Sequence, residues 1–475
     1  ADECGERAAG AGGAGLMARG KKKEAALSPA ERLQATLVPE SEQPYKVPEN
    51  WCWVSLQTID QYHSSSVDPS KYPSDLFELY SVPSSANDYP EIVRGDEIGS
   101  TKQSVKKGDV LLCKINPRIN RVWKVSQYTE NTLLASSEWI IIRNSEINSD
   151  YLMYCFRAPY FREYMLSNVS GVGGSLMRAQ PKYVKTYPVP IPPFSEQQRI
   201  VDRIESLFAK LDEAKQKAQD ALDSFETRKA AILHKAFNGE LTALWRKEHG
   251  VGMESWDNTT LSKIVVGFKY GTSEKSDYSY EGMPVFRIPN ITDNGLSFED
   301  LKFLSHRDIS DENQIHENDI LIVRSNGSRE LVGKSVLVPQ LDREYAYASF
   351  LIRIQPLDLV VPNYLVMYLN STDARMQMFK KAKSSAGINN INSKELGAIL
   401  INLPSFPEQA EIVRILDDIL AKEQQAKEAT EKVLEQIDLT KKAILARAFR
   451  GELGTNDPTE ESAVELLKKS FERGE

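Results

Sequence analysis

Two short loops of this 475-residue chain concentrate Arg, Asn, Lys and Ser side chains. The first loop spans 114–121 and carries Lys114, Asn116, Arg118, Asn120 and Arg121. The second spans 324–329 and carries Arg324, Ser325, Asn326, Ser328 and Arg329. Arg suits the paired acceptors of guanine, Asn suits adenine, and Lys or Ser reaches phosphate oxygens. We therefore predict nucleic-acid binding by both loops, although any single member is more typical of a solvated surface.

A later pair of loops has the same polar and basic character. The segment 170–178 contributes Ser175 and Arg178. The segment 380–392 contributes Lys381, Lys383, Asn389 and Asn390. Because such loops recur at corresponding places, the set as a whole is a stronger candidate for base and phosphate contacts than any member.

Residue patterns of common catalytic sites are incomplete in this chain. Ile191 precedes Pro192-Pro193-Phe194, where an adenine amino-methyltransferase needs Asp or Asn to hold the exocyclic amine. Gly333-Lys334-Ser335 lacks the first glycine of a phosphate-binding loop at the required spacing. No metal-ligand spacing or convincing nuclease pattern is found. We expect a non-catalytic chain with no metal and no cofactor of its own.

Charge, cysteines and hydropathy bound the remaining possibilities. The net charge of −8 argues against a protein that coats nucleic acid indiscriminately, so binding must come from local basic loops. The four cysteines form no Cys-x-x-Cys pair, which is typical of reduced thiols in a cytoplasmic protein. No run of about 18 apolar residues predicts a membrane helix.

The elements that must position these loops are repeated along the chain. Phe194-Ser195-Glu196-Gln197 recurs as Phe406-Pro407-Glu408-Gln409 in the second half of the sequence. The segments that close the two copies, 231–241 and 443–453, share Ala-Ile-Leu and Ala-Phe-x-Gly-Glu-Leu at the same offset. No insertion or deletion has entered either copy, so we infer that the length of the segment matters.

Each repeated segment is predicted to be one long helix with a heptad seam. The apolar seam residues of the first copy are Val201, Ile204, Phe208, Leu211, Leu222, Phe225 and Ile232. Those of the second copy are Val413, Leu416, Leu420, Leu434, Ile437 and Ile444. Because each stripe is narrow, we expect the two helices to pack on each other as an antiparallel coiled coil, with the globular blocks at opposite ends.

These signals divide the chain into six segments. Residues 1–27 read as a disordered extension or an expression remnant, and 28–50 as a short helix, with a capping box at 28–31, and a linker. Two α/β blocks follow at 51–193 (block 1) and 256–405 (block 2), each with strand-like and helix-like patterns. The helical spacers occupy 194–255 and 406–475. The edges of the blocks agree while their interiors diverge, as two recognition modules with different targets would, although drift after duplication would also produce this.

The chain resembles the DNA-specificity subunits of type I restriction-modification systems from residue 28 onward. The resemblance is carried by 190–201 and its repeat, by Ala-Phe-x-Gly-Glu-Leu, and by the motifs at 325–335 and 384–391. It implies two α/β target-recognition domains separated by a long antiparallel two-helix coiled coil, with each domain reading one half of a bipartite, asymmetric site in double-stranded DNA. It also implies two methyltransferase subunits that bring S-adenosylmethionine and adenine-N6 chemistry, and motor-endonuclease subunits for cleavage.

Two other function classes are weighed against this reading. A coiled-coil scaffold that joins two protein-binding domains would need exposed apolar patches on its blocks. A solitary methyltransferase would need the cofactor-binding and amine-holding motifs, which are missing here.

Overall fold

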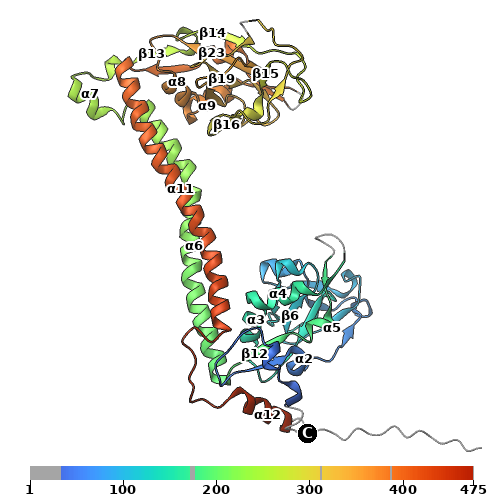
Figure 1. The fold of residues 1–475 in the computed structure, drawn as a ribbon. Coiled ribbons are helices and arrows are strands. Elements are labelled where there is room, and N and C mark those ends of the chain that lie inside the picture. Colours follow the sequence, from blue (N-terminus) through green and yellow to red (C-terminus); the bar gives the residue numbers. More distant parts are fainter. Residues whose placement is uncertain (1–33, 172–176, 311–312, 386–387, 474–475) are drawn as a thin grey trace, which may run out of the picture. The chain divides into compact units, whose positions relative to one another are not determined.

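The computed structural model describes residues 34–171, 177–310, 313–385 and 388–473 (Figure 1). It divides into two compact units. Unit 1 comprises Ala1–Glu213 and Ile437–Glu475, and unit 2 comprises Ala214–Gln436. Each unit therefore contains one α/β block and the adjoining parts of both long helices. The capping residues 28–31 lie outside the described residues.

Unit 1 contains short sheets flanked by helices. Its strands are β1 (Cys52–Ser55), β2 (Ser66–Val67), β3 (Leu76–Tyr80), β4 (Glu91–Arg94), β5 (Lys102–Ser104), β6 (Val110–Cys113), β7 (Val122–Lys124), β8 (Thr132–Ala135), β9 (Trp139–Ile142), β10 (Val169–Ser170), β11 (Arg178–Ala179) and β12 (Pro188–Ile191). They form a five-stranded sheet in the order β2-β5-β8-β3-β4, a three-stranded sheet β7-β6-β9, and the pairs β1-β12 and β10-β11. The helices are α2 (Leu56–Ile59), α3 (Ser149–Arg157), α4 (Pro159–Ser167), α5 (Pro181–Val184) and α12 (Ala463–Arg473).

The strand-type runs of block 1 are buried strands in the structure. β6 and β9 pair antiparallel with Val110 opposite Ile142, and every residue of both strands is buried. The segment from Tyr151 to Leu166, whose large apolar residues have helical spacing, lies in two helices rather than one. The break falls at Ala158, which is extended, because the residue before a proline disfavours the helical conformation.

Unit 2 repeats this plan with different strand lengths. Its strands are β13 (Asp257–Thr260), β14 (Val265–Tyr270), β15 (Pro284–Phe286), β16 (Ile291–Thr292), β17 (Gly295–Leu296), β18 (Lys302–Phe303), β19 (Ile320–Val323), β20 (Ser325–Asn326), β21 (Ser335–Leu337), β22 (Ala346–Tyr347), β23 (Leu351–Pro356), β24 (Lys383–Ser385), β25 (Ile388–Asn390) and β26 (Leu400–Leu403). The sheets have the orders β14-β23-β19-β21, β18-β15-β22, β20-β25-β24, β13-β26 and β16-β17. The helices are α7 (Ala243–His249), α8 (Pro362–Leu369), α9 (Thr372–Lys381) and α10 (Ser393–Gly397).

The repeated segments form two long helices, α6 (Phe194–Phe237, 44 residues) and α11 (Phe406–Ala448, 43 residues). In unit 1 the first part of α6 packs on the last part of α11, where the Nζ of Lys441 pairs with Asp212. In unit 2 the last part of α6 meets the first part of α11, and the Nη2 of Arg228 lies 3.0 Å from the Oε2 of Glu423. The pairing is therefore antiparallel in each unit.

The predicted apolar seam residues are buried or half-buried on both helices. Val201, Ile204 and Phe225 are buried on α6, and Val413, Leu416 and Ile437 are buried on α11. The other apolar seam residues, Phe208, Leu211, Leu222, Ile232, Leu420, Leu434 and Ile444, are half-buried. None of the helices in the described part of the chain combines the length and the apolarity that a bilayer crossing requires.

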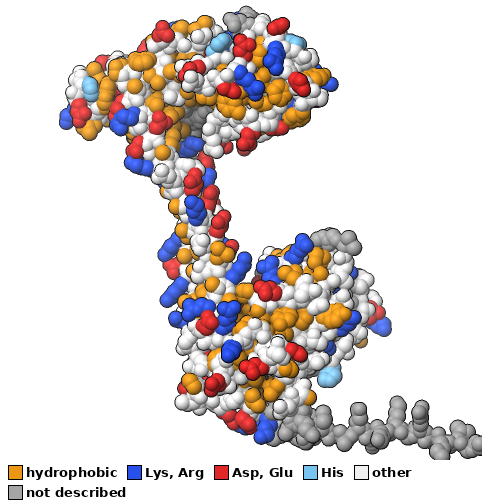
Figure 2. Space-filling model, viewed as in Figure 1, with side chains coloured by type: hydrophobic (Ala, Val, Ile, Leu, Met, Phe, Trp, Pro, Cys, Tyr) orange, Lys and Arg blue, Asp and Glu red, His pale blue; other side chains and the backbone are white. Residues whose placement is uncertain are grey.

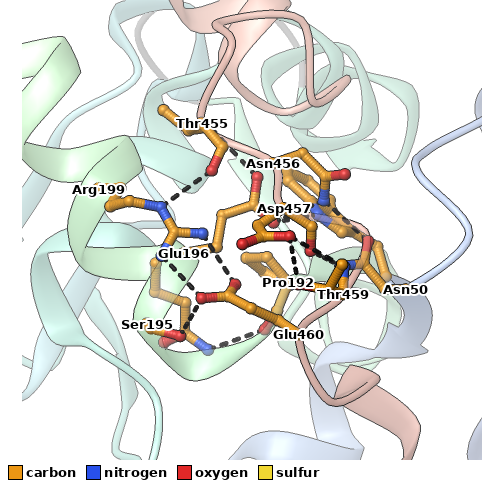
Figure 3. Close-up of polar contacts among 12 residues, drawn as sticks. Asn50, Pro192, Ser195, Glu196, Arg199, Thr455, Asn456, Asp457, Thr459 and Glu460 are labelled. Carbon is orange, nitrogen blue, oxygen red and sulfur yellow. Dashed lines mark hydrogen bonds and ion pairs between the residues drawn. The ribbon is translucent and has the colours of Figure 1, made fainter.

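The Glu-Gln motif at the start of α6 joins this helix to block 1. The carboxylate of Glu196 is fully buried and accepts a hydrogen bond from the indole Nε1 of Trp51, at 2.7 Å. It also accepts from the Oγ1 of Thr455 (3.2 Å) and the Nδ2 of Asn456 (2.9 Å), which follow α11 in the chain (Figure 3). Arg199, one turn along α6, forms a two-pronged ion pair with Glu460, at 2.8 Å for each nitrogen. The motif thus connects the start of α6 to block 1 and to the segment that follows α11.

Unit 2 has the same arrangement of contacts at the start of α11. The buried carboxylate of Glu408 accepts from the Nε1 of Trp256 (2.9 Å), the Oγ1 of Thr242 (2.7 Å) and the Nη1 of Arg246 (2.7 Å). Thr242 and Arg246 follow α6 in the chain, just as Thr455 follows α11. The segment after each helix therefore closes on the start of the other helix.

The glutamine of the motif holds the first helix of each block's helical pair. The Oε1 of Gln197 accepts from the backbone N–H of Asn148 at 2.8 Å, directly before α3. The Oε1 of Gln409 accepts from the N–H of Val361 at 2.8 Å, directly before α8. Each amide also donates to a proline carbonyl, that of Pro192 or Pro404. The motif consequently fixes the block's helices relative to the adjoining long helix.

Candidate nucleic-acid interface

In unit 1 the two predicted loops of block 1 lie side by side. The backbone N–H of Ala179 donates to the carbonyl of Lys114, and the N–H of Asn116 donates to the carbonyl of Met177, both at 2.8 Å. Loop 114–121 thus runs beside strand β11, and its residues Pro117–Ile119 form a 3-10 turn. Segments that are far apart in the sequence are thus joined by main-chain hydrogen bonds.

Unit 2 joins its two predicted loops in the same way. The N–H of Ile391 donates to the carbonyl of Arg324 at 2.9 Å. Strand β20 pairs with β25, with Asn326 opposite Asn389, and the Nδ2 of Asn389 donates to the carbonyl of Gly327 at 3.2 Å. The equivalent main-chain contact therefore recurs in both blocks.

Several candidate base-reading side chains are held by intramolecular contacts. The guanidinium of Arg324 lies over the ring of Tyr270, 4.6 Å from its centre, and its Nε is 3.4 Å from the Oδ1 of Asn390. Arg178 pairs with Glu138 at 3.2 Å. Asn326 accepts a hydrogen bond from the N–H of Ser328. These contacts orient the side chains or shape the loop backbone.

Other candidates are exposed or half-buried. Arg118, Ser328 and Arg329 are exposed, while Lys114, Asn116, Asn120, Arg121 and Lys381 are half-buried. The Nη2 of Arg329 donates to the carbonyl of Phe379, at 3.0 Å. Ser175 and the side chain of Lys383 lie outside what the structure describes. On the faces visible in Figure 2, Lys and Arg side chains are interspersed with Asp and Glu, so positive charge is confined to small areas of the surface.

The structure adds two arginines that the sequence reading missed, Arg162 on α4 and Arg375 on α9. The Nη2 of Arg162 donates to the carbonyl of Arg118, at 2.5 Å, and the Nη2 of Arg375 donates to the carbonyl of Glu330. Each arginine fixes the backbone of the loop in its own block. Arg162 and Arg375 are separated by nearly the same number of residues as the two copies of the repeat. This spacing could have identified them as a corresponding pair from the sequence.

The glycine-lysine-serine sequence has a structural explanation. The Nζ of Lys334 pairs with Asp293, at 2.7 Å, and Ser335 begins strand β21. Cys52, Cys113 and Cys155 are free and buried. Within the described ranges, no group of three or more His, Cys, Asp or Glu side chains has the arrangement of a metal site.

Comparison with known proteins identifies the family. The family model described as "Type I restriction modification DNA specificity domain" matches residues 76–222 and 253–436. The chain belongs to this family of type I specificity subunits. The paired match agrees with the internal repeat, and the predicted fold class of two α/β blocks with a paired long-helix element is confirmed.

Individual relatives have low sequence identity to this chain, but the matches cover about two thirds of it. The chain is 28% identical over 336 residues to the specificity subunit of the type I restriction enzyme EcoKI from Escherichia coli strain K12, covering 68% of this chain and 71% of that protein. It is 24% identical over 310 residues to the StySPI specificity subunit from Salmonella potsdam, covering 65% and 66% respectively.

Solved structures share the fold of this specificity subunit. The HsdS subunit from Thermoanaerobacter tengcongensis is similar with a TM-score of 0.60 at 22% identity, over 87% of this chain and 100% of that one. A chain from a structural study of complex assembly and conformational transition of the type I R-M system has a TM-score of 0.70 at 22% identity, over 86% and 100%.

Proposed function

We propose that each block of this specificity subunit reads one half of a bipartite, asymmetric site in double-stranded DNA. The observation that carries the proposal is the recurrence of one loop arrangement in both blocks. Each block joins two polar, basic loops through an equivalent main-chain bond, from Ala179 to Lys114 and from Ile391 to Arg324. The loop residues themselves differ, which is what two readers with different base targets require.

We further infer that the chain acts without catalytic chemistry of its own. Two methyltransferase subunits dock on the long helices and bring S-adenosylmethionine and the adenine-N6 transfer, and motor-endonuclease subunits join for cleavage in the cytoplasm. Membership of the family supports this assembly. The chain's contribution is to hold the recognition loops in register with the helices, through the buried carboxylates of Glu196 and Glu408.

The test exchanges one block at a time. Residues 256–405 are replaced by the corresponding block of another specificity subunit, and DNA modified by the assembled complex is read by methylation-sensitive long-read sequencing. One half of the methylated motif should change while the other half is retained. The matched control replaces 51–193 and should change the opposite half. A change of both halves in either hybrid would rule out independent reading.

A further inference from the structure

Unit 1 contains a basic cavity of about 600 Å³ between the loop 119–122, helices α3 and α4, and the last part of α11. Its cationic lining residues are Arg121, Arg157, Arg162 and Lys442. Glu163 is the one carboxylate among the described lining residues. We propose that this cavity is a phosphate-binding site.

Arg157 supplies a half-buried positive charge that no described carboxylate contacts at ion-pair distance. Its Nη2 donates to the carbonyl of Val122 at 2.8 Å, and it forms no ion pair with a described carboxylate. Burial lowers the pKa of Arg157, with Tyr154 and Asp88 acting in the opposite direction. A partly buried guanidinium is more favourable when an anion pairs with it, and a bound phosphate would supply that partner.

Arg162 presents an unused donor at the same place. Its Nη2 holds the carbonyl of Arg118, whereas its Nε is buried and has no hydrogen-bond acceptor within the described residues. Buried donors without an acceptor are uncommon in folded proteins and call for a specific explanation. Guanidinium groups bind oxyanions strongly, so a phosphate in the cavity would give Arg162 an anionic partner, although its Nε is covered in this conformation.

Lys442 brings a third element into the cavity. It is exposed on α11, and no hydrogen bond or ion pair to a described residue engages its ammonium group. The site therefore combines a loop, a pair of short helices and a long helix, all within unit 1. A ligand bound there would contact the recognition loop and the spacer helix together.

The repeat provides an internal comparison for this cavity. Ala230 occupies the position of the first copy that corresponds to Lys442, and Asn370 lies within one position of the counterpart of Arg157. The amide of Asn370 is used within the fold, since its Nδ2 donates to the carbonyl of Ser335 at 2.7 Å. Two of the four cations thus have no counterpart in unit 2, so the cavity is not required by the shared scaffold.

The phosphate can come from two sources. Asn120 and Arg121 belong both to the candidate recognition loop and to the cavity lining, which favours a backbone phosphate of bound DNA. This part of the inference rests on the proposed function. A free phosphate or pyrophosphate offers the same chemistry and is tested separately.

The DNA arm uses the full chain assembled with its methyltransferase subunits and a duplex that carries the methylated motif. Lys442→Ala should reduce the slope of log affinity against log salt concentration by about 0.9, the value for one lost phosphate contact. The methylated motif should be unchanged. Lys432→Ala removes the same charge from an exposed position of α11 in unit 2, and should leave the slope as in the wild type.

The second arm titrates pyrophosphate into the full chain by calorimetry. Binding that Lys442→Ala weakens and Lys432→Ala does not would support the site with a free anion as its ligand, whether or not the DNA slope changes. An unchanged slope together with no Lys442-dependent pyrophosphate binding overturns the proposal. If the wild-type complex binds no specific duplex, the proposed function fails, while the pyrophosphate arm still tests the cavity.

Discussion

At the scale of single residues, the two blocks use an arginine in the same structural role. Arg162 and Arg375 each reach from the second helix of a helical pair to a carbonyl of the neighbouring polar loop. Neither side chain needs to touch DNA to affect recognition. A loop whose backbone is fixed keeps its base-reading side chains oriented before DNA arrives, which lowers the entropic cost of binding.

Removing one of these arginines should affect one half-site. Arg375→Gln loses the bond to Glu330, and we expect affinity to fall by roughly 5–10-fold, from about 1–1.5 kcal/mol for one hydrogen bond. Specificity should relax in the half-site read by block 2 alone. Motif sequencing and binding to duplexes altered in one half measure this. Arg414→Gln, an exposed change on α11, is the control, and equal effects on both halves would contradict the positioning role.

The buried carboxylate of Glu408 should be important for the stability of unit 2. Glu408→Ala leaves Arg246, Thr242 and Trp256 without their common acceptor. Breaking a buried ion pair in this way typically costs about 3–5 kcal/mol, because the remaining charge stays buried and unpaired.

Hydrogen-exchange mass spectrometry of the full chain tests this second prediction, because unfolding of a two-unit protein need not be two-state. Exchange should accelerate in 238–257 and at the start of α11. Asp418→Ala removes an exposed carboxylate that pairs with Lys422 on the surface of α11, and should leave exchange in 238–257 unchanged. Similar protection in both variants would show that the contacts of Glu408 do not stabilise unit 2.

At the scale of elements, two helices of 44 and 43 residues suggest a spacer of defined length. We expect four residues inserted in α6 beside Ala218 to add one helical turn, roughly 6 Å, with only a small rotation. Since base pairs are about 3.4 Å apart, the gap between the two methylated half-sites should lengthen by one or two base pairs. The half-sites themselves should remain as they were. Ala218 suits the insertion because a small seam residue tolerates a local stutter.

A two-residue insertion at the same position is the informative control. It rotates the following part of α6 by about half a turn and takes the apolar seam out of contact with α11. The complex should then fail to assemble, as size-exclusion chromatography would show. An active four-residue variant with an unchanged gap would mean that the helices do not set the spacing.

At the scale of the whole molecule, recognition and chemistry are expected to reside on different chains. The purified chain, incubated with labelled S-adenosylmethionine and unmodified DNA, should transfer no methyl group above background. Addition of the methyltransferase subunits should restore transfer to the bipartite site. Transfer by the chain alone would contradict the non-catalytic role.

The amino-acid sequence by itself determined the repeat, the two long helices and the position of the polar loops. These features are local or periodic along the chain. The heptad seam is a spacing of three and four residues, and the segment 194–241 recurs as 406–453 without a gap. Short apolar runs such as Trp139–Ile142 likewise predict strands from the sequence alone.

Only the tertiary structure decided which residues hold the loops and what the repeated motif does. Arg162 meets a carbonyl 44 residues away, and Glu196 meets Asn456 across 260 residues. Neither contact has a local pattern, because a hydrogen bond depends on the placement of two atoms that the folded sheets and helices bring together. The sequence marked Glu196 as the start of a helix, whereas folding made it a buried acceptor for three side chains from two distant segments of the chain.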